Sequence, residues 1–182
     1  HGEESERIAN EVLHRLKMDN DTIKKVTKLV KWHDVRTQPT PKAVRKAMNK
    51  LGEELYPLLL QVQYADTMAQ STYQREEKLE RIHKVKVIYE QIIEEKQCFS
   101  IRNLAVNGKD LIAIGVTQGK QIGEILNILL EDVLEEPSHN TYLNWRKIKS
   151  DRKHDAHVFC LFFGFRFFRI LSYTSPQKNC IQ

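Results

Sequence analysis

Apolar side chains recur at the spacing of an α-helix along most of the first 135 residues, and this pattern limits the possible folds more than any other feature. No segment before residue 98 needs a β-strand. The periodicity is strongest over residues 120–135, where one stripe comprises Ile122, Ile125, Leu126, Leu129, Leu130, Val133 and Leu134. The sequence therefore predicts an all-α fold.

Residues that begin and end helices separate these periodic segments. Asp19 can cap the helix that follows it, and Thr40 before Pro41 is typical of a helix start. Gly52 can supply the left-handed conformation that ends a helix. The predicted helices cover residues 3–17, 22–32, 41–51, 53–70, 74–96 and 120–135.

The distribution of glycine divides this helical chain. Four of the seven glycines fall at Gly108, Gly115, Gly119 and Gly123, and Asn107-Gly108 predicts a turn. We expect a helical bundle, followed by a smaller helical unit that is hinged by these glycines. The predicted boundaries are 1–97 for the bundle, 98–145 for the smaller unit and 146–182 for a remaining tail.

The net charge of +5 suggests an acidic partner such as nucleic acid, but this charge is unevenly distributed. Residues 146–182 hold eight basic and two acidic residues, which leaves 21 basic and 22 acidic residues before them. These 37 residues also contain six of the seven phenylalanines. We interpret them as an atypical tail, aberrant or disordered, rather than as part of the fold.

The cysteines and the hydropathy limit which classes of protein are possible. Cys98, Cys160 and Cys180 are widely spaced and include no C-x-x-C pair, which argues against a disulfide framework or a cysteine zinc site. A reducing cytoplasm is the expected location. No apolar run reaches the roughly 18 residues that a membrane span needs, and no membrane partner is predicted.

His33 and Asp66 each follow an apolar stripe at helical spacing. His33 continues the stripe of Ile23, Val26 and Val30. Asp66 shares a stripe with Leu59, Val62 and Ala69. A buried carboxylate needs a cation, a hydrogen bond or a metal. Two interpretations stay open: a divalent metal site, or a satisfied histidine and an aspartate paired with a neighbouring Arg, Lys or amide.

The glycine-rich segment also allows two interpretations. Lys120 and the free amides near Gln121 would favour a phosphate at the start of the following helix. Alternatively, the glycines only let two helices pack closely. The charged stretch that contains Arg75 and Lys78 is most simply a solvated helix face.

Several segments resemble one enzyme family. LAVNGKDLIAIGVTQGKQIGEILNILLEDVLEEP, which begins at Leu104, is similar to the C-terminal signature of bacterial CCA-adding enzymes, the tRNA nucleotidyltransferases of the poly(A) polymerase family. LVKWHD, PLLLQVQYADTMAQS and YQREEKL resemble the HD-type helical region of the same family. The resemblance covers residues 1–145 and stops before the phenylalanine-rich tail.

The resemblance implies an enzyme that adds C, C and A to tRNA 3′ ends from CTP and ATP with Mg²⁺. The chain lacks a Gly-Ser phosphate motif and a strand-borne Asp-x-Asp, so the resemblance implies a C-terminal fragment without the catalytic head. The remaining part would hold the tRNA acceptor arm. The expected phosphate contacts are Lys109, Gly115, Gly119, Lys120 and Gln121, with a weaker contribution from Arg75 and Lys78.

The HD-type resemblance also implies metal ligands. His1, His33 and Asp66 fall where later ligands of the HD pattern would lie, and Asp34 completes the letters of the motif. The principal His-Asp pair would lie upstream, so the expected divalent metal site is incomplete. A metal-dependent HD-type phosphohydrolase and a non-catalytic structural remnant are the alternative functions.

Overall fold

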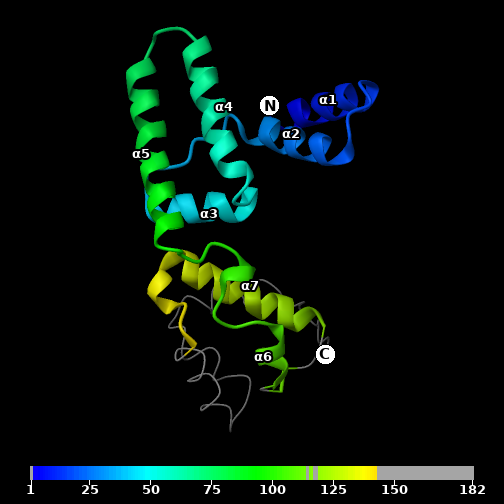
Figure 1. Cartoon of the computed structure of the whole chain (residues 1–182), viewed down its shortest axis with the longest axis vertical. Coiled ribbons are helices and arrows are strands. Elements are labelled where there is room, and N and C mark those ends of the chain that lie inside the picture. The colour runs from blue at the N-terminus through cyan, green and yellow to red at the C-terminus, as the bar shows by residue number, and fades with distance from the viewer. Residues whose placement is uncertain (1, 114, 117–118, 143–182) are drawn as a thin grey trace, which may run out of the picture.

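The structure is a computed structural model that describes residues 2–113, 115–116 and 119–142. Within these ranges the chain forms α-helices and two short 3-10 helices, without a strand, and the all-α prediction is confirmed (Figure 1). The elements are α1 (Gly2–Arg15), α2 (Asn20–Trp32), α3 (Pro41–Leu51), α4 (Leu55–Ala69), α5 (Arg75–Glu94), η1 (Ile101–Asn103), α6 (Gly108–Ala113), α7 (Lys120–Glu135) and η2 (Pro137–His139).

The cap residues act as the sequence predicts. Asp19 Oδ1 accepts a hydrogen bond from the amide of Thr22 at 2.9 Å, which begins α2. Thr40 Oγ1 accepts one from the amide of Ala43 at 3.3 Å, which begins α3. Gly52 ends α3 with a φ of 92°, a conformation that favours glycine. These caps explain why the predicted bounds of α2 and α3 lie within two residues of the observed ones.

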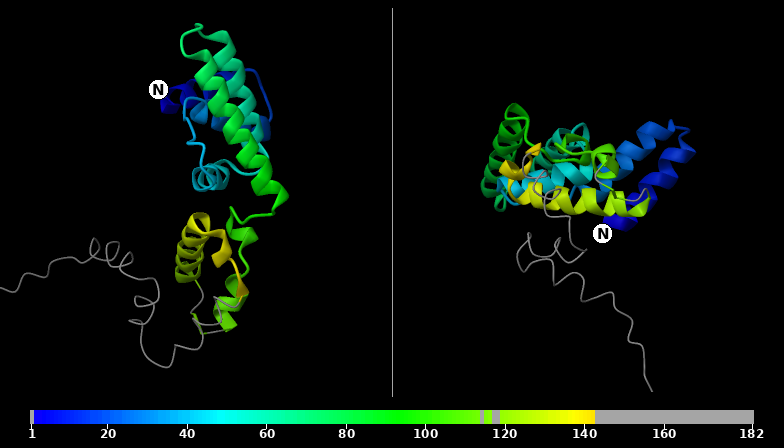
Figure 2. Two further views of the ribbon diagram at one scale, coloured as in Figure 1. Left: turned by 90° about the vertical axis from the view of Figure 1, so that its left-hand side faces the viewer. Right: turned by 90° about the horizontal axis from the view of Figure 1, so that it is seen from below.

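The helices form two packed groups joined through α3. α4 and α5 make an antiparallel hairpin, α3 crosses its lower end, and the α1–α2 pair projects sideways from α4 (Figure 1). α6 and α7 lie on the other side of α3 from the hairpin in Figure 1 and in the left view of Figure 2. α7 contacts α3, so α3 is the element that connects the hairpin to the C-terminal helices.

One hydrophobic cluster runs from the hairpin through α3 into α7. Met48 of α3, Tyr56 of α4, Ile92 of α5 and Val133 of α7 are each at most 1% exposed. Cys98 and Phe99, between α5 and η1, are buried in the same cluster. The division between two units near residue 97 stays a prediction.

The short helix α6 corrects one prediction. Asn107-Gly108 does not form a simple turn, because Gly108 is the first residue of α6. Asn107 Oδ1 accepts from the amide of Lys109 at 2.8 Å, and Asp110 Oδ2 accepts from the amide of Asn107 at 2.9 Å. This reciprocal arrangement is a helix-capping box, so the residues that indicated a turn instead begin a helix.

The buried face of α4 differs from the predicted one. Val62 is 38% exposed and Ala69 is exposed, so the prediction that Asp66 belongs to a buried stripe with them is wrong. The buried face instead passes through Leu59, Gln63 and Thr67. It was missed because two of its members are polar, although the fold gives them internal hydrogen bonds.

The remaining predictions about residues 146–182 lie outside the described residues, as does His1. In the part of the chain that the structure describes, no helix combines the length and hydrophobicity needed to cross a bilayer.

Candidate functional site

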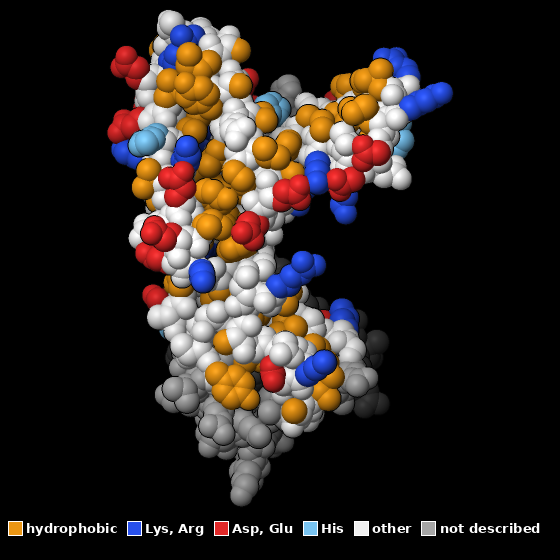
Figure 3. All heavy atoms as spheres, in the orientation of Figure 1, with side chains coloured by type: hydrophobic (Ala, Val, Ile, Leu, Met, Phe, Trp, Pro, Cys, Tyr) orange, Lys and Arg blue, Asp and Glu red, His pale blue; other side chains and the backbone are white. Residues whose placement is uncertain are grey.

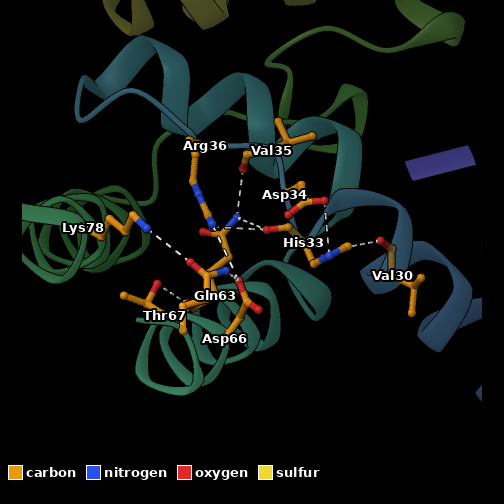
Figure 4. A network of polar contacts seen from close by, with 10 residues as sticks. Val30, His33, Asp34, Val35, Arg36, Gln63, Asp66, Thr67 and Lys78 are labelled. Atoms are coloured by element: carbon orange, nitrogen blue, oxygen red, sulfur yellow. Dashed lines mark hydrogen bonds and ion pairs between the residues drawn. The ribbon is translucent and has the colours of Figure 1, made fainter. Parts of the chain in front are cut away.

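His33 and Asp34 lie in the connector between α2 and α3 (residues 33–40). His33 Nδ1 lies 2.6 Å from the carbonyl oxygen of Val30, and its Nε2 lies 3.3 Å from Asp34 Oδ2 (Figure 4). A carbonyl oxygen only accepts, so Nδ1 carries a proton in this arrangement. Both ring nitrogens therefore lie close to groups of the connector and the last turn of α2.

Gln63 of α4 fastens this connector to the hairpin. Its Nε2 donates to the carbonyl oxygens of His33 at 3.1 Å and Val35 at 2.8 Å (Figure 4). Thr67 Oγ1 donates to the carbonyl oxygen of Gln63 at 2.7 Å. These bonds explain how two polar side chains, 4% and 1% exposed, are tolerated on a buried face.

Asp66 is paired with protein groups. Its Oδ2 accepts from Gln70 Nε2 at 2.7 Å and lies 3.7 Å from Arg36 Nη2. Arg36 Nη1 also donates to the carbonyl oxygen of His33 at 3.3 Å (Figure 4). This is the arrangement of the second interpretation, in which the aspartate is paired with a neighbouring arginine.

The described residues alone do not fit a divalent metal centre. Among them, no three His, Cys, Asp or Glu side chains form a group that could hold an ion. Nδ1 of His33 faces a carbonyl oxygen, and Asp66 is shared between Arg36 and an amide. The ligand set that includes His1 and Asp34 stays a prediction.

The glycine-rich segment brings the starts of α6 and α7 together. A Cβ on Gly108 would lie 3.2 Å from Ile122 Cγ2, so close helix packing explains this glycine. Gly115 and Gly119 have φ values of 92° and 119°, and a Cβ on either would meet no described atom within 4 Å. Their backbone conformation, rather than packing, therefore requires glycine.

Two exposed lysines flank these glycines. The Lys120 side chain is 91% exposed, and its Nζ lies 3.4 Å from Glu124 Oε1. Lys109 is exposed on the first turn of α6. The N-cap of α7, Gly119, provides no side-chain hydrogen bond, and Gln121 is exposed on the first turn of this helix. Lys120 therefore lies on the first turn of α7, and Lys109 lies on the first turn of α6, whose start packs against α7.

Arg75 and Lys78 lie far from this group, at the opposite end of the molecule (Figure 1). Arg75 Nη2 donates to the carbonyl oxygens of Gln70 at 2.6 Å and Met68 at 3.3 Å, which caps the end of α4. Lys78 Nζ donates to Gln70 Oε1 at 3.2 Å. The structure therefore divides the predicted RNA-contacting residues into two separate groups.

A buried arginine that the sequence analysis missed joins α3 to α7. Arg45 is 4% exposed, and its guanidinium donates to the carbonyl oxygens of Leu134 at 3.0 Å and Glu135 at 3.2 Å. It also donates to Gln97 Oε1 at 2.9 Å. Burial lowers the pKa of Arg45. We call this contact the α3–α7 junction (Lys42, Arg45, Lys46, Gln97, Glu131, Leu134 and Glu135).

Glu135 completes the α3–α7 junction. Its carboxylate lies 2.5 Å from Lys42 Nζ and 3.0 Å from Lys46 Nζ. The hydrogen bonds from these lysines lower the pKa of Glu135. The signal was present in the sequence, because basic residues at i, i+3 and i+4 of one helix can meet the acidic pair Glu131 and Glu135 of another.

Elsewhere, several surface cations of the described chain pair with nearby carboxylates. Examples are the pairs Lys84–Glu80 and Lys86–Glu90 on α5. The space-filling view accordingly shows blue and red side chains interspersed over the hairpin and the α1–α2 pair (Figure 3). Contact with a polyanion would depend on a few local positions rather than on one large positive surface.

The comparison with protein families gives a match over most of the described chain. A family model described as tRNA nucleotidyltransferase domain 2 matches residues 3–142, which include the hairpin, the α3–α7 junction and the glycine-rich segment. The searches of curated proteins and of solved structures each gave no match. The family match agrees with the resemblance carried by the segment that starts at Leu104, and the chain belongs to the tRNA nucleotidyltransferase domain 2 family.

Proposed function

We propose that this chain binds the acceptor arm of tRNA as the helical part of a CCA-adding tRNA nucleotidyltransferase. The observation that carries the proposal is the family match over residues 3–142. Nucleotidyl transfer from CTP and ATP, with Mg²⁺, is assigned to a catalytic head outside these helices. The function of the chain is then to hold the tRNA while its 3′ end is extended.

The start of α7 is the proposed phosphate-contacting site. Gly108 lets the starts of α6 and α7 approach, which brings Lys109 and Lys120 to the same region. Gly115 and Gly119 allow the backbone to turn there. Ammonium groups and helix-start amides bind phosphates without reading bases, as expected for a protein that accepts many tRNAs.

A salt series of tRNA binding tests this proposal on the full chain. We compare the wild type with the Lys109→Ala/Lys120→Ala variant and with Lys84→Ala/Lys86→Ala, a matched control on α5. The first variant should bind tRNA more weakly and show a shallower dependence of log K on log salt, by about one to two units of slope. The control should match the wild type.

The control isolates the α7 site because both variants lose the same charge and keep the basic residues after Trp145. Absence of tRNA binding at low salt would overturn the proposed function. Equally weaker tRNA binding in both variants would overturn the assignment of the site, because the change in net charge alone would then explain the loss of affinity.

The contacts of His33 favour a second role for the HD-like residues, as a structural remnant rather than a phosphohydrolase. The His33 carbonyl accepts from both Arg36 and Gln63, and its ring is engaged locally. His33→Ala keeps the main-chain carbonyl but removes the ring contact with the Val30 carbonyl, so it should lower the thermal midpoint and leave tRNA affinity unchanged. Stoichiometric Mn, Fe, Ni or Mg in the purified chain, together with phosphodiesterase activity, would contradict this role.

A further inference from the structure

A small pocket lies between α4, α5 and the connector that follows α2. Three cationic side chains line it, Arg36 from the connector and Lys78 and Arg81 from α5. The buried polar side chains of Gln63 and Thr67 also line it, and apolar side chains of α4 and α5 complete the wall. Figure 4 shows that Arg36 and Lys78 come from different elements, and its dashed line from Lys78 marks the hydrogen bond with Gln70 Oε1. Three residues that carry a positive charge therefore contribute to the lining of one concave site.

The carboxylates near this pocket do not saturate its cations. Arg36 Nη2 lies 3.7 Å from Asp66 Oδ2, and Arg81 Nη2 lies 3.9 Å from Glu77 Oε1. Both distances exceed the roughly 2.7–2.9 Å of a charge-assisted hydrogen bond. Lys78 Nζ has a neutral amide oxygen as its hydrogen-bond acceptor at 3.2 Å. Among the described residues, the three cations thus retain donors for a further anion.

We propose that this pocket binds a phosphate group. A phosphate is compact and carries several acceptor oxygens, which suit two guanidinium groups and one ammonium group. The small size of the pocket excludes a base or a sugar as the buried group. The site extends the proposed function, because it lies on the hairpin and the start of α7 lies at the other end of the molecule (Figure 1). The phosphate could belong to an RNA backbone or to a small phosphorylated molecule.

The first arm of the test uses inorganic phosphate with the full chain. Chloride keeps the ionic strength constant while thermal midpoints and ³¹P NMR line widths are followed. The wild type and Lys84→Ala/Lys86→Ala should respond saturably to phosphate. Lys78→Ala/Arg81→Ala should bind about 100-fold more weakly, since each hydrogen bond to a charged group accounts for roughly tenfold in affinity.

The second arm measures tRNA binding by the same three proteins. Weaker binding by Lys78→Ala/Arg81→Ala than by the control would identify an RNA phosphate as the ligand. Loss of the phosphate response with unchanged tRNA affinity would identify a small phosphorylated ligand. The proposal that the pocket binds a phosphate would be wrong if the wild type responded to phosphate no more than to chloride and both variants bound tRNA equally.

Two further measurements keep the result interpretable. Circular dichroism and the thermal midpoint without phosphate establish that each variant folds, and Lys78→Arg, which keeps the positive charge, should retain phosphate binding. If the wild type does not bind tRNA at all, the proposed function fails while the phosphate arm still decides the pocket. The two proposals can therefore fail independently.

Discussion

The α3–α7 junction and the α1–α2 arm (residues 2–32) are both held by charged residues, but in different surroundings. At the α3–α7 junction, Arg45 is 4% exposed and donates to main-chain carbonyls 89 and 90 residues away. In the α1–α2 arm, α1 contains no buried residue, and the side chains of Arg7 and its partner Glu11 are 58% and 65% exposed. Charged contacts thus connect distant segments at the α3–α7 junction, whereas in the arm they act on the surface.

Arg45→Ala should produce a large loss of stability, because it leaves the carbonyls of Leu134 and Glu135 without this donor. We expect a decrease of about 3 kcal/mol in the free energy of unfolding, measured by urea denaturation. Arg45→Met, which fills the space without donating, separates packing from hydrogen bonding. A Met variant as stable as the wild type would show that the hydrogen bonds contribute nothing net.

Leu129→Ala and Leu16→Ala compare the two regions through their apolar side chains. Leu129 is 1% exposed in the core and Leu16 is 62% exposed beyond the end of α1. Leu129→Ala should cost about 2–5 kcal/mol because it creates a cavity, and Leu16→Ala less than about 0.5 kcal/mol. Urea denaturation measures both values. A similar loss for both variants would mean that the arm is covered in solution.

Acid titration should distinguish Glu135 at the α3–α7 junction from Glu4 in the arm. Lysine hydrogen bonds lower the pKa of Glu135 in the folded state, so its contribution to stability is present above the unfolded pKa, about 4.3. That contribution is lost as the pH falls through the lowered folded value. Unfolding of the wild type should therefore depend more steeply on acid than that of Glu135→Gln.

Glu4→Gln is the matched control for this titration. Its hydrogen bond with Arg7 also lowers the pKa of Glu4, but both side chains are well exposed and solvent screens them. Its unfolding profile below pH 5 should stay close to that of the wild type. Identical acid-unfolding profiles for all three proteins would contradict the proposed contribution of Glu135 to stability.

Lys31→Ala should produce the smallest effect of this series. Lys31 Nζ lies 2.6 Å from Glu6 Oε2 and links α2 to α1, but both side chains are more than a third exposed. The expected loss is small at low salt and smaller still at high salt, because salt screens exposed pairs. Thermal midpoints at two salt concentrations measure it. A loss that is independent of salt would indicate a packing role for the Lys31 side chain.

Local chemistry explains which elements could be predicted from the sequence. Asp19, Thr40 and Gly52 act on neighbouring backbone groups, so their roles follow from residue type and position alone. Asn107 misled the turn prediction because the same side chain can stabilise a turn or begin a helix. The choice depends on Asp110, three residues later, whose carboxylate accepts from the amide of Asn107.

The polar contacts of the candidate sites could not be predicted from the sequence, because hydropathy does not show which distant residues meet. Gln63 looks like a surface residue in the sequence, yet it is buried because two carbonyls of the connector accept its amide protons. Lys78 was expected on a solvated face, and only the fold brings it to the same pocket as Arg36. Such pairings arise from the way distant helices cross, which periodicity within one helix does not encode.

The cap that Arg45 places on α7 has a mechanical consequence. α7 contains 16 residues, so it is a rod of about 24 Å with Glu135 at its anchored end and Lys120 at its tip. A tilt of about 10° at the anchor would displace the tip by about 4 Å, more than the length of a hydrogen bond. The α3–α7 junction therefore holds one end of α7 and α6 packs near the other, so a change at either contact would shift the position of Lys120.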